Sequence, residues 1–208
     1  MPDEIAGIQC LKDVRCGKWS RLADAARAGL PVPAGFFATS GTSEKQIRSA
    51  YDELKVREYT YYVAVRAPTH AILDVIGPDR LMYTLRRLWL ELPDAELLIQ
   101  TMVNSAWCGK AAWEGKNLRI RASEGLQCLD PDMYLYNTTT KKCSRRILHQ
   151  RPRKVFRGVD GTTRTMEIVA ERRPMESKYL EAIADLVQRA EADITWALDD
   201  RRVWLINV

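Results

Sequence analysis

Residues 193–206 have the sequence DITWALDDRRVWLI, which contains two short β-prone runs separated by Asp199 and Asp200. The stretch before them, 176–191, repeats apolar residues at helical spacing. One face of this predicted helix carries Leu180, Ile183, Val187 and Ala190. We therefore predict a helix followed by an antiparallel hairpin of residues 193–198 and 202–207.

Helix and strand patterns alternate through the rest of the chain. Apolar β-prone runs at 61–66 and 97–103 flank an amphipathic helix at 78–92 that begins with proline. A run of short segments between 107 and 157 is typical of a meandering antiparallel sheet. The pattern predicts an α+β protein with two lobes, an N-terminal lobe of residues 1–95 and a C-terminal lobe of residues 96–208.

The composition is that of an ordinary globular protein. Of 208 residues, 46% are hydrophobic and 28% are charged, with both signs interspersed, which excludes disordered and low-complexity classes. We find no apolar run long enough to span a membrane, and residues 1–4 are acidic where a signal peptide is basic. The five cysteines follow neither a disulfide nor a zinc pattern. We expect a cytoplasmic protein with free thiols and no membrane partner.

The formal net charge is +5, and much of the excess lies between Lys141 and Arg157. Such a charge suits a polyanionic partner. Single-strand binders, however, interleave their cations with aromatic side chains for base stacking, and this stretch does not. We interpret it as the solvated face of a hairpin and do not expect a nucleic-acid partner.

Five stretches, in order along the chain, carry a family resemblance. Residues 17–37 (GKWSRLADAARAGLPVPAGFF) resemble GKGANLAEL…AGLPVPPGF, and residues 63–66 (VAVR) resemble AVRSS. Residues 98–103 (LIQTMV) resemble VVVQRMV, and residues 122–136 resemble ASWGLGE…VTPDRYVV. Residues 193–206 resemble DIEWALD…LYILQARP. These are segments of the N-terminal nucleotide-binding domain of the phosphoenolpyruvate synthase and pyruvate phosphate dikinase family, which includes rifampicin phosphotransferase.

The resemblance implies an ATP-grasp-like fold, in which nucleotide lies between two α+β lobes around a central cleft. The family uses ATP to phosphorylate a histidine on a separate swivelling domain, which passes the phosphoryl group to a domain that handles pyruvate. Neither of these domains is recognisable in the sequence. The resemblance therefore implies that any transfer is to another molecule, such as a partner protein that carries the phosphohistidine domain.

The resemblance also implies a set of nucleotide-binding residues. Lys18 matches the family's phosphate-contacting lysine, and Arg66 matches an arginine that reaches the phosphates from the end of a strand. Gln100, Met102 and Val103 match the strand beside adenine. The alternatives remain open: a surface lysine for Lys18, a salt bridge between the lobes for Arg66, and core packing for the strand.

The metal-binding part of the motif is incomplete. Asp193 matches the first acidic residue of the closing motif, but the glutamate that resembles a metal ligand is replaced by Thr195. The family's glutamine and arginine on the last strand fall at Ile206 and Val208. We expect that Asn207 cannot replace them, because neighbouring strand residues point to opposite faces.

The glycine-rich turn departs from the family as well. Glu124 stands for its tryptophan, Gln127 for its second glycine and Cys128 for its glutamate, so close approach of the backbone to phosphate becomes harder.

We interpret the chain as a degenerate, kinase-like nucleotide-binding module, a pseudoenzyme that acts through a partner. It would bind ATP weakly and depend little on magnesium. Two alternatives remain open: an ATP-dependent phosphotransferase component that works with a separately encoded phosphohistidine domain, and an interaction protein that binds no nucleotide. The sequence does not decide whether the chain is an enzyme.

Overall fold

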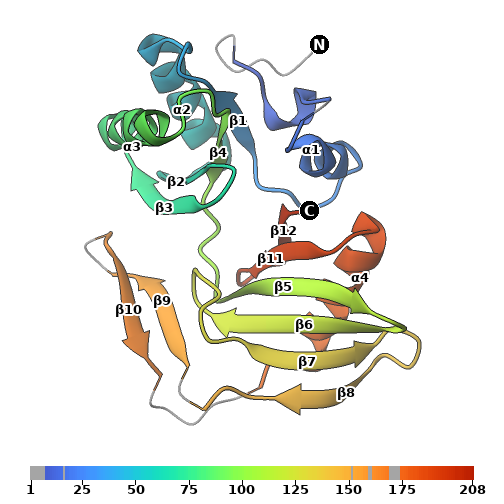
Figure 1. Ribbon diagram of the computed structural model, residues 1–208. Helices are drawn as coiled ribbons and strands as arrows, with labels where there is room; N and C mark the ends of the chain where they lie inside the picture. The colour runs from blue at the N-terminus through green and yellow to red at the C-terminus, as the bar shows by residue number, and fades with distance from the viewer. Residues whose placement is uncertain (1–7, 16, 151, 159–160, 169–173) are drawn as a thin grey trace. The chain divides into compact units, whose positions relative to one another are not determined.

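The computed structural model describes residues 8–15, 17–150, 152–158, 161–168 and 174–208. Cys16, Arg151 and the acidic residues 1–4 lie outside the described residues. The chain divides into two compact units, whose elements are labelled in Figure 1. Unit 1 comprises residues 1–28 and 33–102, and unit 2 comprises residues 29–32 and 103–208.

Unit 1 is built on a four-stranded antiparallel sheet with the strand order β1-β4-β2-β3. Its strands are β1 (Gly35–Ala38), β2 (Tyr62–Arg66), β3 (Ala71–Ile76) and β4 (Leu97–Thr101). Its helices are a short 3-10 turn η1 (Leu11–Asp13), α1 (Ser20–Arg27), α2 (Glu44–Glu58) and α3 (Pro78–Glu91). Helix α2 begins at a capping box, in which the Ser43 side chain accepts from the Gln46 amide and the Gln46 side chain accepts from the Ser43 amide.

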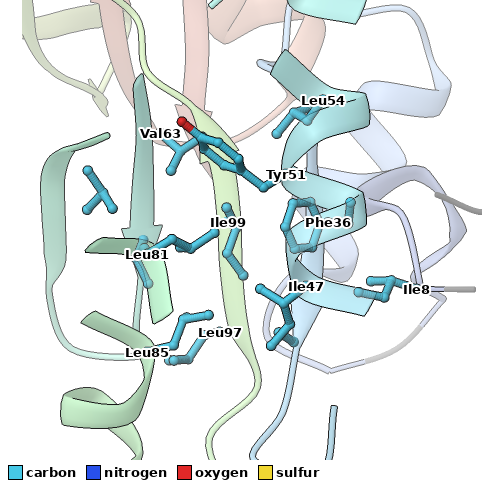
Figure 2. Packing of buried hydrophobic residues seen from close by; sticks show 14 of the residues in the cluster. Ile8, Phe36, Ile47, Tyr51, Leu54, Val63, Leu81, Leu85, Leu97 and Ile99 are labelled. Carbon is cyan, nitrogen blue, oxygen red and sulfur yellow. The ribbon is translucent and has the colours of Figure 1, made fainter. Parts of the chain in front are cut away.

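Helices α2 and α3 cover one face of this sheet and enclose the core of unit 1 (Figure 2). Ile47, Tyr51 and Leu54 of α2 are almost fully buried against the strands. Leu81 and Leu85 of α3 complete the same cluster. The residues that alternate with the core positions of the strands, among them Arg66 on β2 and Gln100 on β4, therefore lie on the opposite face.

Unit 2 contains a six-stranded antiparallel sheet with the order β12-β11-β5-β6-β7-β8, and a separate two-stranded hairpin. The sheet strands are β5 (Trp107–Glu114), β6 (Asn117–Glu124), β7 (Asp132–Asn137), β8 (Lys142–Ile147), β11 (Ile194–Leu198) and β12 (Val203–Asn207). The hairpin is β9 (Arg153–Arg157) with β10 (Thr163–Glu167), and the helix is α4 (Ser177–Ala190).

Helix α4 packs on β5, β11 and β12, and its apolar stripe is the one predicted from the sequence. Trp196 of β11 and Tyr134 of β7 are fully buried in unit 2. Among the described residues, no helix combines the length and the apolar character that crossing a bilayer requires. The α+β class follows directly from these elements. The cytoplasmic location stays a prediction.

The boundary between the units differs from the one we expected. It falls after Met102 and not after residue 95, because β4 pairs with both β1 and β2. In addition, residues 29–32 belong to unit 2, where the Pro31 carbonyl accepts a hydrogen bond from the Leu205 amide at 2.8 Å. That contact occupies part of the otherwise open edge of β12.

Candidate functional site

Arg66 and the nearby Lys18, which we call the cationic group of unit 1, lie beside the face of the sheet opposite α2 and α3. Arg66 ends β2, and its Nε donates a hydrogen bond to Gln100 Oε1 at 2.8 Å. In the strand register, Arg66 lies opposite Leu98 and Gln100 lies opposite Ala64. Arg66 and Gln100 are therefore diagonal neighbours on one face of the sheet, a separation that long side chains can bridge.

The buried Gln100 side chain fixes the position of Arg66 through hydrogen bonds. It is fully buried, and its Nε2 donates to the Pro33 carbonyl at 3.0 Å. Close approach of the two strands requires glycine at position 35, because a Cβ there would lie 2.5 Å from the Ile99 carbonyl oxygen. Gly35, the first residue of β1, thus has a packing reason, because it lets β1 lie close to β4.

Burial sets the electrostatics of Arg66. Desolvation lowers the pKa of its guanidinium to about 10, so the group stays protonated at neutral pH. Among the described residues, no carboxylate lies within ion-pairing distance of it. A half-buried cation without a carboxylate is costly, and an anionic ligand would relieve that cost. No ion pair of Arg66 is formed within the described residues of unit 1, and the salt bridge between the lobes that we considered for it stays an open alternative.

Lys18 lies close to the same segment. Its ammonium donates to the carbonyl of Pro68, two residues beyond Arg66, and lies 5.4 Å from the centroid of the Trp19 ring. Trp19 packs on Phe37 of β1, which lies on the same sheet face as Gln100. The structure therefore brings Lys18 near the segment that carries Arg66, whose partner is Gln100, within unit 1. The Lys18 side chain is exposed, so the alternative that it is an ordinary surface lysine stays open.

Met102 and Val103 lie at the junction between the units. Met102 closes unit 1, with its amide donating to the Tyr62 carbonyl at 3.0 Å, and Val103 opens unit 2. Both side chains are half-buried. Val103 packs against an apolar cluster of Cys108, Ala197 and Ile206 in unit 2. This position agrees with core packing, and the adenine-binding role of both residues stays a prediction.

Asp193 belongs to unit 2 and lies beside a hollow of about 280 Å³. Its Oδ1 accepts a hydrogen bond from the Trp113 amide at 3.1 Å. The side chain is exposed, and the other lining residues bring no second acidic side chain into this hollow: Lys110, Ala111, Ala112, Ile194, Thr195, Asn207 and Val208. Across the described ranges, no three His, Cys, Asp or Glu side chains are grouped so that they could hold a metal ion. The residues present thus do not fit a resident magnesium ion, which prefers carboxylate oxygens.

The geometric reason for which we expected Asn207 to be unable to replace the family's glutamine and arginine was wrong, and whether Asn207 takes over their role stays open. The β11–β12 register shifts by one residue, from Trp196 opposite Leu205 to Thr195 opposite Asn207. Ile206 is the extra residue of this bulge, and a bulge places two successive residues opposite one partner. Asn207 therefore shares with Thr195 the hollow beside Asp193, while Ile206 packs against Cys108 and Ala197.

Sequence reasoning also missed Lys110. The register pairs Thr195 with Lys110 on β5, and Lys110 with Arg121 on β6, so two exposed cations lie side by side next to Thr195. Like charges directly opposite one another destabilise a sheet. Only the register reveals this pair, because the two residues lie in different strands.

Comparison with known proteins supports the fold. No protein-family model matches the chain, and no curated protein matches it by sequence. The structure resembles D-alanine–D-alanine ligase from Bacillus anthracis, with a TM-score of 0.53 and 12% identity over 95% of this chain and 57% of the ligase. The same ligase complexed with ATP gives a TM-score of 0.52 and 11% identity over 95% of this chain and 56% of the ligase.

The chain thus spans a little more than half the length of these structures. At this level of identity the likeness concerns the fold alone, and the arrangement of the two units around a cleft stays a prediction. The ligases belong to the ATP-grasp class, and this chain has an ATP-grasp-like α+β fold.

Proposed function

We propose that this chain is a nucleotide-binding domain of the phosphoenolpyruvate synthase and pyruvate phosphate dikinase type, which has lost the metal-binding half of its site. It binds ATP chiefly through the phosphates and acts as a module on a partner protein. One observation carries the proposal: within an ATP-grasp-like fold, Arg66 is half-buried, held by Gln100, and lacks a carboxylate partner in the described residues.

The chemistry of unit 1 favours an anion. The Arg66 guanidinium keeps donors that Gln100 does not use, and such forks suit phosphate oxygens. Lys18 adds a second cation, anchored at Pro68. A charge-assisted hydrogen bond from the half-buried Arg66 would contribute about 1.5–3 kcal/mol to phosphate binding without a metal. The exposed Lys18 would add less, because solvent screens its charge.

The chemistry of unit 2 disfavours magnesium. Asp193 is the only acidic side chain among the described residues that line its hollow, and its Oδ1 accepts a hydrogen bond from the Trp113 amide. Lys110 adds a positive charge at the same place. A site with one carboxylate and an adjacent ammonium suits an anion better than a divalent cation. ATP-dependent phosphoryl transfer by this chain alone is therefore not part of the proposal.

The partner that we propose is a protein carrying a phosphohistidine domain, the element that this type of nucleotide domain serves. The proposal rests on the sequence resemblance, because the described residues contain no partner-specific feature that identifies it. Co-purification with a tagged phosphohistidine-domain protein encoded near this chain would test it. If the chain binds no such protein, the proposed partner is wrong, and the proposed ATP binding is tested separately.

Calorimetric titration with ATP tests the nucleotide proposal. Arg66→Ala should weaken ATP binding about 10-fold to 100-fold, since 1.4 kcal/mol corresponds to a factor of ten. Arg66→Lys, which keeps the charge but not the fork, should recover part of the loss. The matched control is Arg80→Ala, which removes an exposed arginine of α3. No ATP binding by the wild-type chain, or equal losses in Arg66→Ala and Arg80→Ala, would overturn the proposal.

A further inference from the structure

Unit 2 contains a second hollow, of about 840 Å³, whose walls come from four separate segments. These are residues 104–106 before β5, residues 125–126 after β6, residues 154–157 of β9, and the β11–β12 turn with Trp204. None of them belongs to the cationic group of unit 1 or to the hollow beside Asp193. The hollow has the size of a ligand site.

Backbone hydrogen bonds fix three of the walls to one another. The Gly125 amide donates to the Ala106 carbonyl at 2.7 Å, and the Leu126 amide donates to the Val155 carbonyl at 2.7 Å. The Ser105 hydroxyl donates to the Gly125 carbonyl at 2.8 Å. Gly125 has a φ of +94°, and a Cβ there would lie 2.1 Å from the Val155 oxygen. Only glycine allows this close approach of β9, so the hollow is formed before any ligand arrives.

The fourth wall is fixed by Asp199. Its Oδ1 accepts from the Arg201 and Arg202 amides at 2.8 Å each, and its Oδ2 accepts from Trp204 Nε1 at 2.6 Å. Burial raises the pKa of Asp199, but these hydrogen bonds outweigh that effect, and the pKa lies below its ordinary value. The carboxylate is thus committed to shaping the turn.

The same turn presents a flat cationic surface. The Arg202 guanidinium carbon lies 3.7 Å from the centroid of the Trp204 ring, which is the distance of a stacked pair. Arg202 is exposed, so its outer face is accessible, and Phe156 of β9 lies half-buried in the opposite wall. Guanidinium planes and aromatic rings are the surfaces on which unpaired bases stack.

Cations are distributed over both walls of this hollow. Lys154 and Arg157 come from β9, and Arg201 and Arg202 come from the turn. The turn also contributes the carboxylates of Asp199 and Asp200, so the lining has four cationic and two acidic side chains. Lys154 approaches Glu124 only at 4.0 Å. Cations on two separated walls suit successive phosphates of a strand better than one compact phosphate group. The net charge of +5 would attract such a polyanion.

We propose that this hollow binds single-stranded nucleic acid, with a base stacked on the Arg202–Trp204 pair and the flanking phosphates bound by Lys154 and Arg201. The sequence argued against a nucleic-acid partner because the basic stretch contains no interleaved aromatic residues. The fold supplies what that stretch lacks, since Trp204 reaches the hollow from the last strand, far along the chain from β9.

The test is fluorescence anisotropy of a labelled 12-residue oligouridylate and the matching oligothymidylate, titrated with the full chain. We expect saturable binding that weakens with salt, with a log–log slope of about −0.7 for each phosphate contacted. Arg202→Ala should weaken binding about 10-fold, which corresponds to the loss of one stacked base. Lys154→Ala with Arg201→Ala should lower the salt slope. Circular dichroism verifies that each variant is folded.

Two controls separate this proposal from others. Arg145→Ala removes an exposed arginine of β8 outside the hollow and should change the affinity less than twofold. Arg66→Ala should weaken ATP binding without affecting the oligonucleotide, so failure of the nucleotide proposal is distinguishable from failure of this one. The proposal is overturned if neither oligonucleotide binds at low salt, or if Arg145→Ala costs as much as Arg202→Ala. It is equally overturned if ATP displaces the oligonucleotide at the affinity that calorimetry gives, because the hollow would then be part of the mononucleotide site.

Discussion

Each unit carries polar side chains on one face of its sheet, but the two faces differ in how these side chains are held. In unit 1, Arg66 is half-buried and linked through Gln100 to the Pro33 carbonyl. In unit 2, Asp193 is exposed and accepts one backbone hydrogen bond, and its neighbours in the hollow include Lys110. Unit 1 thus holds its arginine in a built hydrogen-bonded arrangement, whereas unit 2 has one acidic side chain beside its hollow, which the proposed function interprets as the remnant of a metal site.

Under the proposed function, this difference indicates which half of the nucleotide site tolerates substitution. Cations fixed by buried hydrogen bonds contribute to both packing and ligand binding, so their removal is costly. A metal site on an exposed sheet face contributes little to the fold, and its carboxylates can be replaced with small effects on stability. The following predictions are designed to break or sharpen this contrast.

The largest effect should follow from Gln100→Leu in unit 1. The substitution leaves Arg66 Nε and the Pro33 carbonyl without their partner, so we expect the free energy of unfolding to fall by about 2–4 kcal/mol. Denaturant titration measures it. The control is Gln188→Leu on the exposed side of α4, which should change stability by less than about 0.5 kcal/mol. Similar losses in the two variants would mean that Gln100 is not the organising residue.

The second prediction restores the lost carboxylate of unit 2. In Thr195→Glu, the affinity for ATP should be at least about fivefold higher with magnesium than without it. This factor is at the lower end of ordinary coupling between two ligands. Titrations with magnesium and with chelator measure the ratio, and Thr195→Gln provides the uncharged control. If the ATP affinity of Thr195→Glu does not depend on magnesium, the hollow beside Asp193 is not the remnant of a metal site.

A smaller effect is expected for Lys18→Ala. Because the ammonium is exposed, its contribution is screened by solvent, and ATP affinity should fall only about 2-fold to 5-fold, with unchanged stability. Lys45→Ala, on the exposed side of α2, is the matched control. A loss as large as that of Arg66→Ala would show that the exposed lysine contributes as much to phosphate binding as the half-buried arginine.

The smallest effect should come from Asp193→Asn. The asparagine oxygen still accepts from the Trp113 amide, so stability should change by less than about 0.5 kcal/mol. ATP affinity with and without magnesium should stay as in the wild-type chain. A marked decrease in affinity only when magnesium is present would instead make Asp193 a metal ligand.

Much of the fold could be predicted from the sequence, because most elements have strong periodicity. The stripes of α3 and α4 and the buried strands β2 and β4 lie where the pattern places them. Two strands escaped prediction. Strand β10 is exposed along its whole length and has no apolar alternation. Strand β3 is interrupted at Asp74, whose φ of +55° coincides with a register shift against β2.

The candidate site was predictable only where it follows a sequence motif. Lys18, Arg66 and Gln100 were named from local matches, and the structure brings them together in unit 1. Asn207 and Lys110 depend on strand register and on a bulge, which no local pattern records. Likewise, Trp204 meets the cations of β9 only in the folded unit.

The most direct test of the account is the affinity of the wild-type chain for ATP, measured by calorimetry with excess magnesium and again with excess chelator. We predict that the two dissociation constants agree within about threefold, because in the proposed function Lys18 and Arg66 bind phosphate without a metal and the hollow of unit 2 has a single acidic side chain. A tight complex that collapses when magnesium is removed would contradict the account, and would show that other residues rebuild the metal site.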